Sequence, residues 1–504
     1  MDIIRKIILR VKNKYMLLSV SGIVCALIQS TLELPFAAFI SYAPLMYCIC
    51  RYDSRRELLK SFVCFFVPYY FYQLAFLTTV YSHIDMNRAA AVSLLLLAAI
   101  ALTLWECLLM SPVFLFIWLR KNNIFDVVSV SILIAAGEWL QEAVPFLSFP
   151  WSAVWLGATG KPILIQTANI LGCRLVTVLI LCVNGFISLA VMEKKRLVPA
   201  LGGAAVMGII LGYGAFSLNR VDNIIKTSEP VTVLIAQDEM EGRKKAGCSA
   251  LECAQSYSDI ISSAEDNDAK LVILPETAVP KGYDENAEEF DMIAALAKDR
   301  KATVISGCFF HFDGDEYNAL YAVDGSGKAC EPYFKQVLVP FGERDPFAFF
   351  SGESTLCECD DDEHTKPLET DVGSVGCVIC IESVYPETVK KQASQGAQIL
   401  CVCTNDSWFG ESYARKLHFR HSIMRAAENG KYLLRSGNCG ISAIIKPTGE
   451  IQQIRRDTSK GVVIGEAALI DHETFYSGAN DLFAVFPALL TVFALIKMYE
   501  KKGS

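Results

Sequence analysis

Three residues with chemically useful side chains each follow an apolar stretch in the second half of the chain. Cys380 follows residues 376–379, Glu276 follows 271–275 and Lys335 follows the aromatic pair 333–334. Apolar runs of this kind are typical of buried strands, so we expect each side chain to lie at a strand end. A carboxylate there can take the proton of a thiol, and an ammonium group can stabilise the thiolate and then an oxyanion. The three residues therefore predict covalent catalysis through a thioester.

Each residue also has an ordinary interpretation. A cysteine after an apolar run is more often a small core residue than a nucleophile, and a free thiol has a pKa near 8.5, so it reacts poorly at neutral pH without help. The order Glu276, Lys335, Cys380 favours the catalytic interpretation. The acceptor of the acyl group then decides the class of enzyme: water gives an amidase, and an amine gives an N-acyltransferase.

The three residues lie in a domain that we expect over residues 229–471, where the composition becomes more polar. Strand-like and helical stretches alternate in it, which predicts a layered α/β fold. The expected strands are 232–236, 271–276, 302–307, 318–323, 372–380, 397–402 and 441–445, and the expected helices are 253–265 and 287–298.

The rest of the chain is predicted to be membrane-embedded. Of its 504 residues 53% are hydrophobic, and a bilayer-spanning helix needs about 20 apolar residues. The candidate spans are 15–30, 34–50, 58–80, 89–119, 125–140, 163–192, 198–218 and 482–497. We therefore expect a membrane domain over 1–220 with seven transmembrane helices and an eighth, C-terminal helix.

The distribution of lysine and arginine predicts the orientation of these spans. Basic residues gather before the first span, near 51–60, at 120–121 and at 194–196, and these positions share one side if all seven early spans cross. Because cytoplasmic loops carry an excess of Lys and Arg, both termini are predicted to be cytoplasmic and the 229–471 domain extracytoplasmic.

Polar and aromatic residues within the membrane part suggest specific environments. Glu106, Glu138 and Arg174 are expected to face the bundle interior, with Arg174 in a pairing or functional role; an interfacial position is an equal alternative for Glu138. Residues 144–157 are apolar, aromatic and interrupted by two prolines. They fit an interfacial or lipid-facing aromatic wall, or a re-entrant packing loop.

The 18 cysteines leave two interpretations open. Eleven fall outside the predicted spans, so at least one is unpaired if the others form disulfides; alternatively, none is oxidised. The Cys-x-Cys pairs 357/359 and 401/403 are not accompanied by nearby ligands that complete a zinc set. Because covalent catalysis by a cysteine needs none, we predict neither a metal nor an organic cofactor.

The triad resembles that of the nitrilase superfamily, and nearly the whole chain is similar to the apolipoprotein N-acyltransferase family, in which a nitrilase-like domain is inserted before the last of eight membrane spans. The motifs that carry this resemblance are 149–151 (FPW), 274–277 (LPET), 317–318 (YN), Lys335 with 339–343 (VPFGE), Cys380 with Glu382, 404–410 (TNDSWFG) and 425–436. The chain departs from the usual pattern at Ile381, where the family usually has an aromatic residue, and at the basic residues 243–245, where it often has a tryptophan nearby.

The resemblance implies an αββα sandwich for the outer domain and a role for each matching residue. Glu276 would be the general base, Lys335 the oxyanion partner and Cys380 the acylated nucleophile. Glu343, Glu382 and Asn318 would support them, and Trp408, Phe409 and Trp151 would contact substrate.

The resemblance also implies the substrates. The donor would be a membrane phospholipid, typically phosphatidylethanolamine, and the acceptor the α-amine of the N-terminal diacylglyceryl-cysteine of an apolipoprotein. The protein would be a monomer in the bacterial cytoplasmic (inner) membrane and would not bind nucleic acid. A membrane-tethered amidase that hydrolyses small amides is the alternative.

Overall fold

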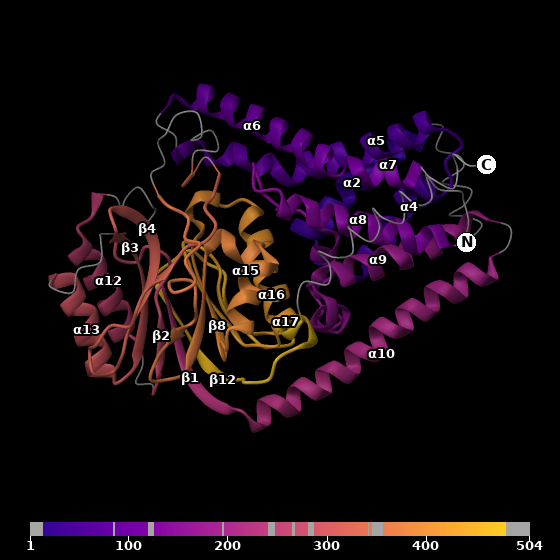
Figure 1. The fold of residues 1–504 in the computed structure, drawn as a ribbon. Helices are drawn as coiled ribbons and strands as arrows, with labels where there is room; N and C mark the ends of the chain where they lie inside the picture. Colours follow the sequence, from indigo (N-terminus) through magenta and orange to yellow (C-terminus); the bar gives the residue numbers. More distant parts are fainter. Residues whose placement is uncertain are drawn as a thin grey trace. The chain divides into compact units, whose positions relative to one another are not determined.

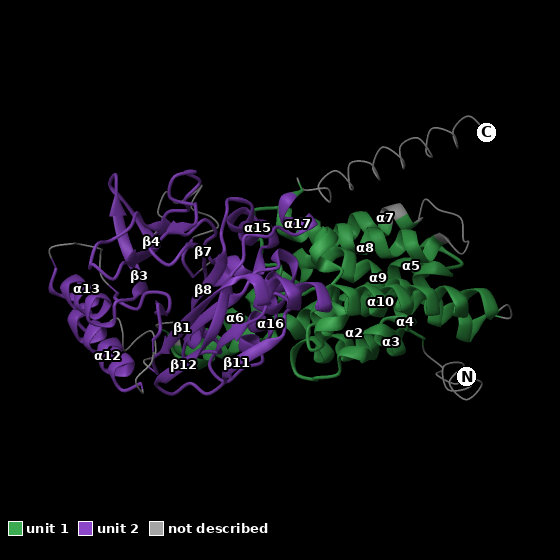
Figure 2. Cartoon of the chain, turned by 90° about the horizontal axis from the view of Figure 1, so that it is seen from below, with its two compact units in different colours: residues 1–217, 479–504 green, residues 218–478 purple. Residues whose placement is uncertain are grey.

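The computed structural model describes residues 14–83, 86–118, 125–193, 196–239, 247–264, 268–280, 287–340, 342–344 and 356–479. The chain divides into two compact units, one comprising residues 1–217 with 479–504 and the other residues 218–478 (Figure 2). The predicted C-terminal span 482–497 and the basic residues 243–245 lie outside the described residues.

The first unit is helical. Its helices are α2 (Lys14–Ser30), α3 (Ala38–Ser41), α4 (Ala43–Cys50), α5 (Arg55–Leu74), α6 (Arg88–Leu109), α7 (Ser111–Trp118), α8 (Phe125–Ala143), α9 (Ala168–Met192) and the first part of α10 (Leu197–Thr227) (Figure 1). Within the described residues, four helical stretches are long and apolar enough to cross a bilayer: Arg55–Ser82, Arg88–Phe114, Ala168–Met192 and Leu197–Thr227. Two more, Lys14–Ser30 and Pro35–Cys50, are shorter. Several apolar helices are thus present, and their number as full spans remains a prediction.

One predicted span starts too early. Residues Pro162–Leu164 form a separate short 3-10 turn, and α9 begins at Ala168. The helix is then kinked at Gly172, whose φ of 73° lies in the left-handed region that glycine adopts without strain. Hydropathy over 163–192 does not register such breaks, because the residues on both sides are equally apolar.

The polar residues of the first unit face its interior, as the sequence predicted. Glu138 accepts hydrogen bonds from the backbone N–H of Val154 at 2.6 Å and from the hydroxyl of Thr177 at 2.7 Å. Arg174 is buried and forms an ion pair with Glu142. Glu138 is also buried, in agreement with the predicted interior position.

The segment 144–157 is a packing loop rather than a lipid-facing aromatic wall. Trp151 is 1% exposed, and its ring stacks on Phe149 with centroids 5.1 Å apart and lies 5.3 Å from Phe76. Trp155 is buried as well, whereas Phe146 is exposed. Large aromatic rings stabilise a fold most when they are fully buried, and both indoles are buried within the helical unit. The lipid-facing interpretation of Trp151 is therefore wrong.

The second unit contains two six-stranded sheets. The first has the order β12-β1-β2-β3-β4-β5, and the second β11-β10-β9-β8-β7-β6. The three neighbouring strands β1, β2 and β3 run parallel, as do β7, β8 and β9. The strands are β1 (Glu229–Gln237), β2 (Leu271–Ile273), β3 (Thr303–Phe312), β4 (Asp315–Val323), β5 (Tyr333–Phe334), β6 (Leu368–Glu369), β7 (Ser374–Ile379), β8 (Ile399–Asn405), β9 (Leu433–Asn438), β10 (Ser442–Ile445), β11 (Ile451–Arg455) and β12 (Gly461–Leu469).

Alternating side chains of the first sheet enter two different cores. Val233 and Ile235 of β1 pack against residues of the second sheet such as Cys377, whereas Leu234 packs in a separate cluster with Tyr257. Tyr257 belongs to α12 (Ala250–Ser262), which covers the outer face of the first sheet together with α13 (Glu288–Arg300). This period of two is the ordinary geometry of a strand covered on both faces.

Helices also cover the second sheet. α15 (Pro386–Ser394) contacts β7, and α16 (Ala414–Asn429) contacts β9. A short helix, α17 (Phe475–Gly478), closes the unit. The layer order is therefore helix, sheet, sheet, helix, which is the predicted αββα sandwich.

Candidate functional site

Cys380 lies where β7 ends and a short 3-10 helix, η5 (Cys380–Val384), begins. Its backbone φ is +52°, in the left-handed region that residues other than glycine rarely adopt. The apolar strand before it is completely buried, whereas Cys380 itself is partly exposed. The sequence expected a strand over 372–380, and the structure ends that strand one residue before the thiol.

Glu276 follows β2 and is held by three donors. Its Oε1 accepts hydrogen bonds from Lys335 Nζ at 3.0 Å and Asn318 Nδ2 at 2.8 Å, and its Oε2 accepts one from the backbone N–H of Asn405 at 2.8 Å. Gly307 allows β3 to approach this turn, because a Cβ there would lie 2.4 Å from Thr277 N. The carboxylate is thus fixed by residues far apart in sequence, and the contribution of Asn405 was not predicted.

Lys335 is fully buried between two carboxylates. Besides Glu276, its Nζ contacts Glu343 at 2.6 Å to Oε1 and 2.8 Å to Oε2. Burial alone would lower the pKa of Lys335, but Glu276 and Glu343 outweigh it and raise that pKa, so the side chain is an ammonium ion. Asn318 also reaches Glu343, at 3.2 Å, and thereby joins the two carboxylates.

The same charges affect the pKa of the Cys380 thiol. Burial raises its pKa well above the ordinary value; Glu276 raises it further, and Lys335 opposes this effect. At neutral pH the nucleophile is therefore a neutral thiol, and its attack requires a base that removes the proton.

Glu382 connects the nucleophile turn to the segment that carries Lys335. It accepts hydrogen bonds from the backbone N–H groups of Ile379 at 2.6 Å and Gln336 at 2.5 Å and from the hydroxyl of Tyr333 at 2.9 Å. Burial raises the pKa of Glu382 to about 7, although these hydrogen bonds partly offset the effect. The neighbouring Ile381 is buried, so the departure from the usual aromatic residue lies in apolar packing behind the nucleophile.

The residues expected to contact substrate occupy three different environments. Trp408, in the short helix Asp406–Phe409, is 44% exposed. Phe409 is partly buried, and its ring meets that of His418 edge-on with centroids 5.8 Å apart. Trp151 belongs to the first unit and is buried there. Of these three residues Trp408 is therefore the most exposed.

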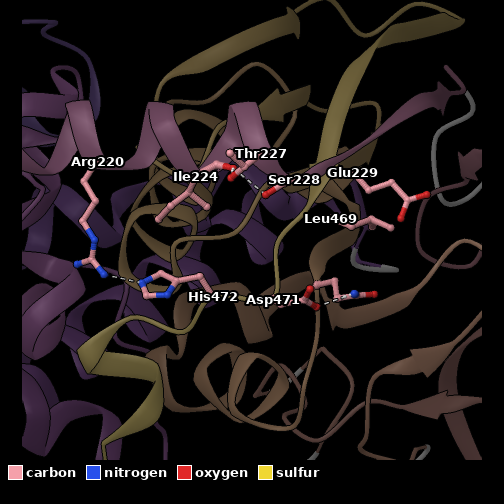
Figure 3. A pocket seen from close by; sticks show the side chains of 9 residues that line it. Arg220, Ile224, Thr227, Ser228, Glu229, Leu469, Asp471 and His472 are labelled. Carbon is pink, nitrogen blue, oxygen red and sulfur yellow. Dashed lines mark hydrogen bonds between the residues drawn. The ribbon is translucent and has the colours of Figure 1, made fainter.

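A cavity of about 410 Å³ lies elsewhere in the second unit (Figure 3). Arg220 on α10 donates a hydrogen bond to the ring of His472 at 2.9 Å beside it, and Asp471 lies next to His472. None of the residues that line this cavity belongs to the predicted site.

All 18 cysteines, which lie within the described residues, are free thiols. The sulfurs of Cys401 and Cys403 lie 3.4 Å apart on β8. Of the two interpretations left open by the sequence, the structure has the one without disulfides.

Two family models match successive parts of the chain. Residues 21–186 match the apolipoprotein N-acyltransferase N-terminal domain, and residues 247–474 match the carbon-nitrogen hydrolase domain. The first match falls in the helical unit, and the second covers β2 to β12 together with Glu276, Lys335 and Cys380.

Relatives named apolipoprotein N-acyltransferase match much or nearly all of the chain. An apolipoprotein N-acyltransferase of Geobacter metallireducens is 24% identical over 497 residues, which are 94% of this chain and 93% of the relative. One of Gloeobacter violaceus is 27% identical over 358 residues, or 69% of this chain and 68% of the relative, and one of Agrobacterium fabrum is 28% identical over 392 residues, or 72% and 70%. With both family models in the expected order and a relative aligned over almost the whole length, the chain belongs to the apolipoprotein N-acyltransferase family.

Proposed function

We propose that this protein is an enzyme that transfers a fatty acyl chain from a membrane phospholipid to the α-amine of the N-terminal diacylglyceryl-cysteine of apolipoproteins, through a thioester on Cys380. Membership of the apolipoprotein N-acyltransferase family supports the reaction class. The observation that carries the residue roles is the position of Lys335 Nζ, 3.0 Å from Glu276 and 2.6 Å from Glu343, beside a thiol whose pKa responds to all three charges.

In the first half-reaction Glu276 takes the proton of the Cys380 thiol, and the sulfur attacks the ester carbonyl of the phospholipid. Lys335 stabilises the oxyanion of the tetrahedral intermediate because its ammonium charge is fixed and shielded from water. The C–O bond of the ester breaks as the C–S bond persists. The proton held by Glu276 passes to the leaving lysophospholipid hydroxyl.

In the second half-reaction the acceptor α-amine attacks the thioester carbonyl. The C–N bond forms, the C–S bond breaks, and the amine loses a proton, which restores the Cys380 thiol. Glu343 keeps Lys335 in place because it accepts hydrogen bonds from Nζ, and Asn318 keeps Glu276 in place because its amide donates to both Glu276 and Glu343. Glu382 holds the nucleophile turn against the segment of Lys335.

The protein is a membrane protein, as its apolar helices and its family indicate. The finer topology that we propose has seven early spans and one C-terminal span, with both termini cytoplasmic and the sheet-containing unit on the outer side of the bacterial cytoplasmic membrane. Phosphatidylethanolamine is the proposed donor, and Trp408 is proposed to line its entrance. We propose that the protein acts as a monomer.

A membrane-tethered amidase is not favoured. An amidase acting on small soluble amides has no need of the N-terminal domain that this chain shares with its relatives. The two functions differ in the acyl donor, and this difference can be measured directly.

The test is the intact mass of the detergent-solubilised full-length protein after incubation with phosphatidylethanolamine. We expect one added fatty acyl mass, lost in Cys380→Ala and retained in Cys377→Ala, which alters a buried cysteine three residues earlier, on β7. Addition of a diacylglyceryl-cysteine peptide should discharge the adduct and acylate the peptide. A folded protein that forms no adduct but hydrolyses small amides would overturn the proposal in favour of the amidase.

A further inference from the structure

A buried polar chain lies behind the nucleophile, on residues to which the proposed reaction gives no role. The backbone carbonyl of Cys380 accepts hydrogen bonds from the Ser383 hydroxyl at 2.8 Å and from His418 Nε2 at 3.0 Å. His418 Nδ1 lies 2.9 Å from Asp406 Oδ1, and Asp406 Oδ2 accepts a hydrogen bond from Arg435 at 2.8 Å. His418, Asp406 and Arg435 are all fully buried.

The hydrogen-bond partners define which nitrogen of His418 carries a proton. Carbonyl oxygens only accept, so Nε2 must donate to Cys380. Nδ1 lies 2.9 Å from the Asp406 carboxylate and 3.0 Å from an Arg435 nitrogen. With one proton on the ring at Nε2, Nδ1 accepts from Arg435; a ring with both protons donates from Nδ1 to Asp406 as well. Nε2 also lies 3.0 Å from the Ser383 hydroxyl, which can accept from it. The contacts at Nδ1 thus orient the imidazole so that Nε2 points to the Cys380 carbonyl.

The carbonyl that accepts this hydrogen bond belongs to Cys380, whose backbone conformation is strained. With φ at +52°, Cys380 adopts backbone geometry that a non-glycine residue keeps only when its surroundings impose it. Because the peptide is planar, a fixed carbonyl also fixes the N–H of Ile381 on the opposite side. A fixed carbonyl direction also restricts rotation about the Cα–C bond of Cys380, so the contacts at this oxygen restrain the Cα atom from which the thiol side chain extends.

We propose that His418, held by Asp406, is a positioning residue that keeps Cys380 in its left-handed conformation, so that the sulfur stays within reach of Glu276 and of the acyl carbonyl. This proposal deepens the proposed function and rests on it for the identity of the acyl donor. His418 acts through the backbone and exchanges no proton with substrate.

The test compares two substitutions of similar size. In His418→Gln the side-chain amide can still donate near the position of Nε2, whereas the shorter amide of His418→Asn reaches toward Asp406 but not to the Cys380 carbonyl. Single-turnover acylation of Cys380 by phosphatidylethanolamine vesicles is followed by intact mass over a range of lipid concentration. We expect the saturating rate to fall about 10²-fold in His418→Asn, as for a misplacement of about 1 Å, with an unchanged half-saturating lipid concentration. His418→Gln should recover most of the rate.

His421 provides the matched control. It lies one turn further along α16 and is as buried as His418. His421→Asn should lower the melting temperature like His418→Asn without the 10²-fold loss of saturating rate. Equal rates in wild type and His418→Asn, or equal losses in His418→Asn and His418→Gln with both proteins folded, would overturn the positioning role.

A second measurement separates this proposal from the proposed function. Alkylation of Cys380 by iodoacetamide, read by peptide mass as a function of pH, requires no phospholipid. We expect the midpoint of the alkylation profile to move in His418→Asn and to stay at the wild-type value in His418→Gln, because only the former releases the sulfur from Glu276 and Lys335. If wild type forms no acyl adduct, the proposed function fails while this shift still supports positioning; coincident alkylation profiles would refute it.

Discussion

Replacement of Lys335 by methionine should cost stability as well as activity, and the cost can be worked out from the site. Glu276 Oε1 and Glu343 Oε1 both lie within 3.0 Å of Nζ, so without the ammonium two buried carboxylates face each other. At a separation of about 6 Å and an effective dielectric constant of about 20, their repulsion is about 3 kcal/mol. That agrees with the range of about 3–5 kcal/mol for breaking a buried ion pair.

The pH dependence of this loss has a definite sign. In Lys335→Met one of the two carboxyl groups takes up a proton, because its folded pKa rises above its unfolded value. A group with a raised folded pKa stabilises the protein less as pH rises. The stability lost by Lys335→Met relative to wild type should therefore be largest at about pH 8 and decrease toward about pH 5. In wild type the raised pKa of Lys335 means that its contribution is lost only at strongly alkaline pH, so lysine titration does not enter this window.

The assay is thermal unfolding of the full-length protein in detergent, alongside formation of the acyl adduct. For a unit of this size about 3 kcal/mol corresponds to a decrease of about 10 °C in melting temperature. The double variant Lys335→Met/Glu343→Gln removes the repulsion and should regain at least half of the decrease, while acylation remains absent in both variants.

Two results would refute this reasoning. A Lys335→Met protein that melts like wild type at about pH 8 would mean that the two carboxylates do not depend on the ammonium for their ionised state. Adduct formation near the wild-type rate would remove Lys335 from the chemistry. A Glu343→Gln protein serves as the control, because Lys335 then keeps its contact with Glu276.

The remaining predictions concern Asp406 and Trp408. Burial would raise the pKa of Asp406, but Arg435 and His418 hold it below its usual range, so its stabilisation is present above about pH 4 and lost as pH falls. Asp406→Asn should therefore lower the melting temperature by about 10 °C near neutral pH, with a smaller difference in acid; equal differences at both pH values would contradict this. Trp408→Ala should raise the half-saturating concentration of long-chain phospholipid about tenfold, as expected for the loss of one apolar contact, and leave a short-chain donor unaffected. Phe475→Ala, which alters another exposed aromatic of the same unit, is the control, and an equal effect there would contradict an entrance at Trp408.

The strands that precede the three triad residues could be predicted because each strand is a short apolar run. β2, β5 and β7 are locally recognisable, and the strand before Cys380 was misplaced by one residue at its end. Helix α16 and strand β9 were not predicted, because they are not simple apolar runs. These elements are buried although they carry Arg425, Glu428 and Arg435, so their composition resembles that of a solvated surface. Hydropathy cannot recognise a buried polar residue whose partner, as for Arg435 and Asp406, lies 29 positions away.

The sequence by itself determined the apolar helices, the alternation of strands and helices in the second unit, the family motifs and the identity of the thiol, carboxylate and ammonium groups. Those features depend on periodicity and residue type within a few positions. The tertiary structure decided that Lys335 meets Glu276 across 59 positions, that Trp151 turns inward and that Cys380 adopts a positive φ supported by His418. Each of these depends on the packing of distant segments, because a hydrogen bond or a strained residue persists only where neighbours from elsewhere in the chain supply its partners.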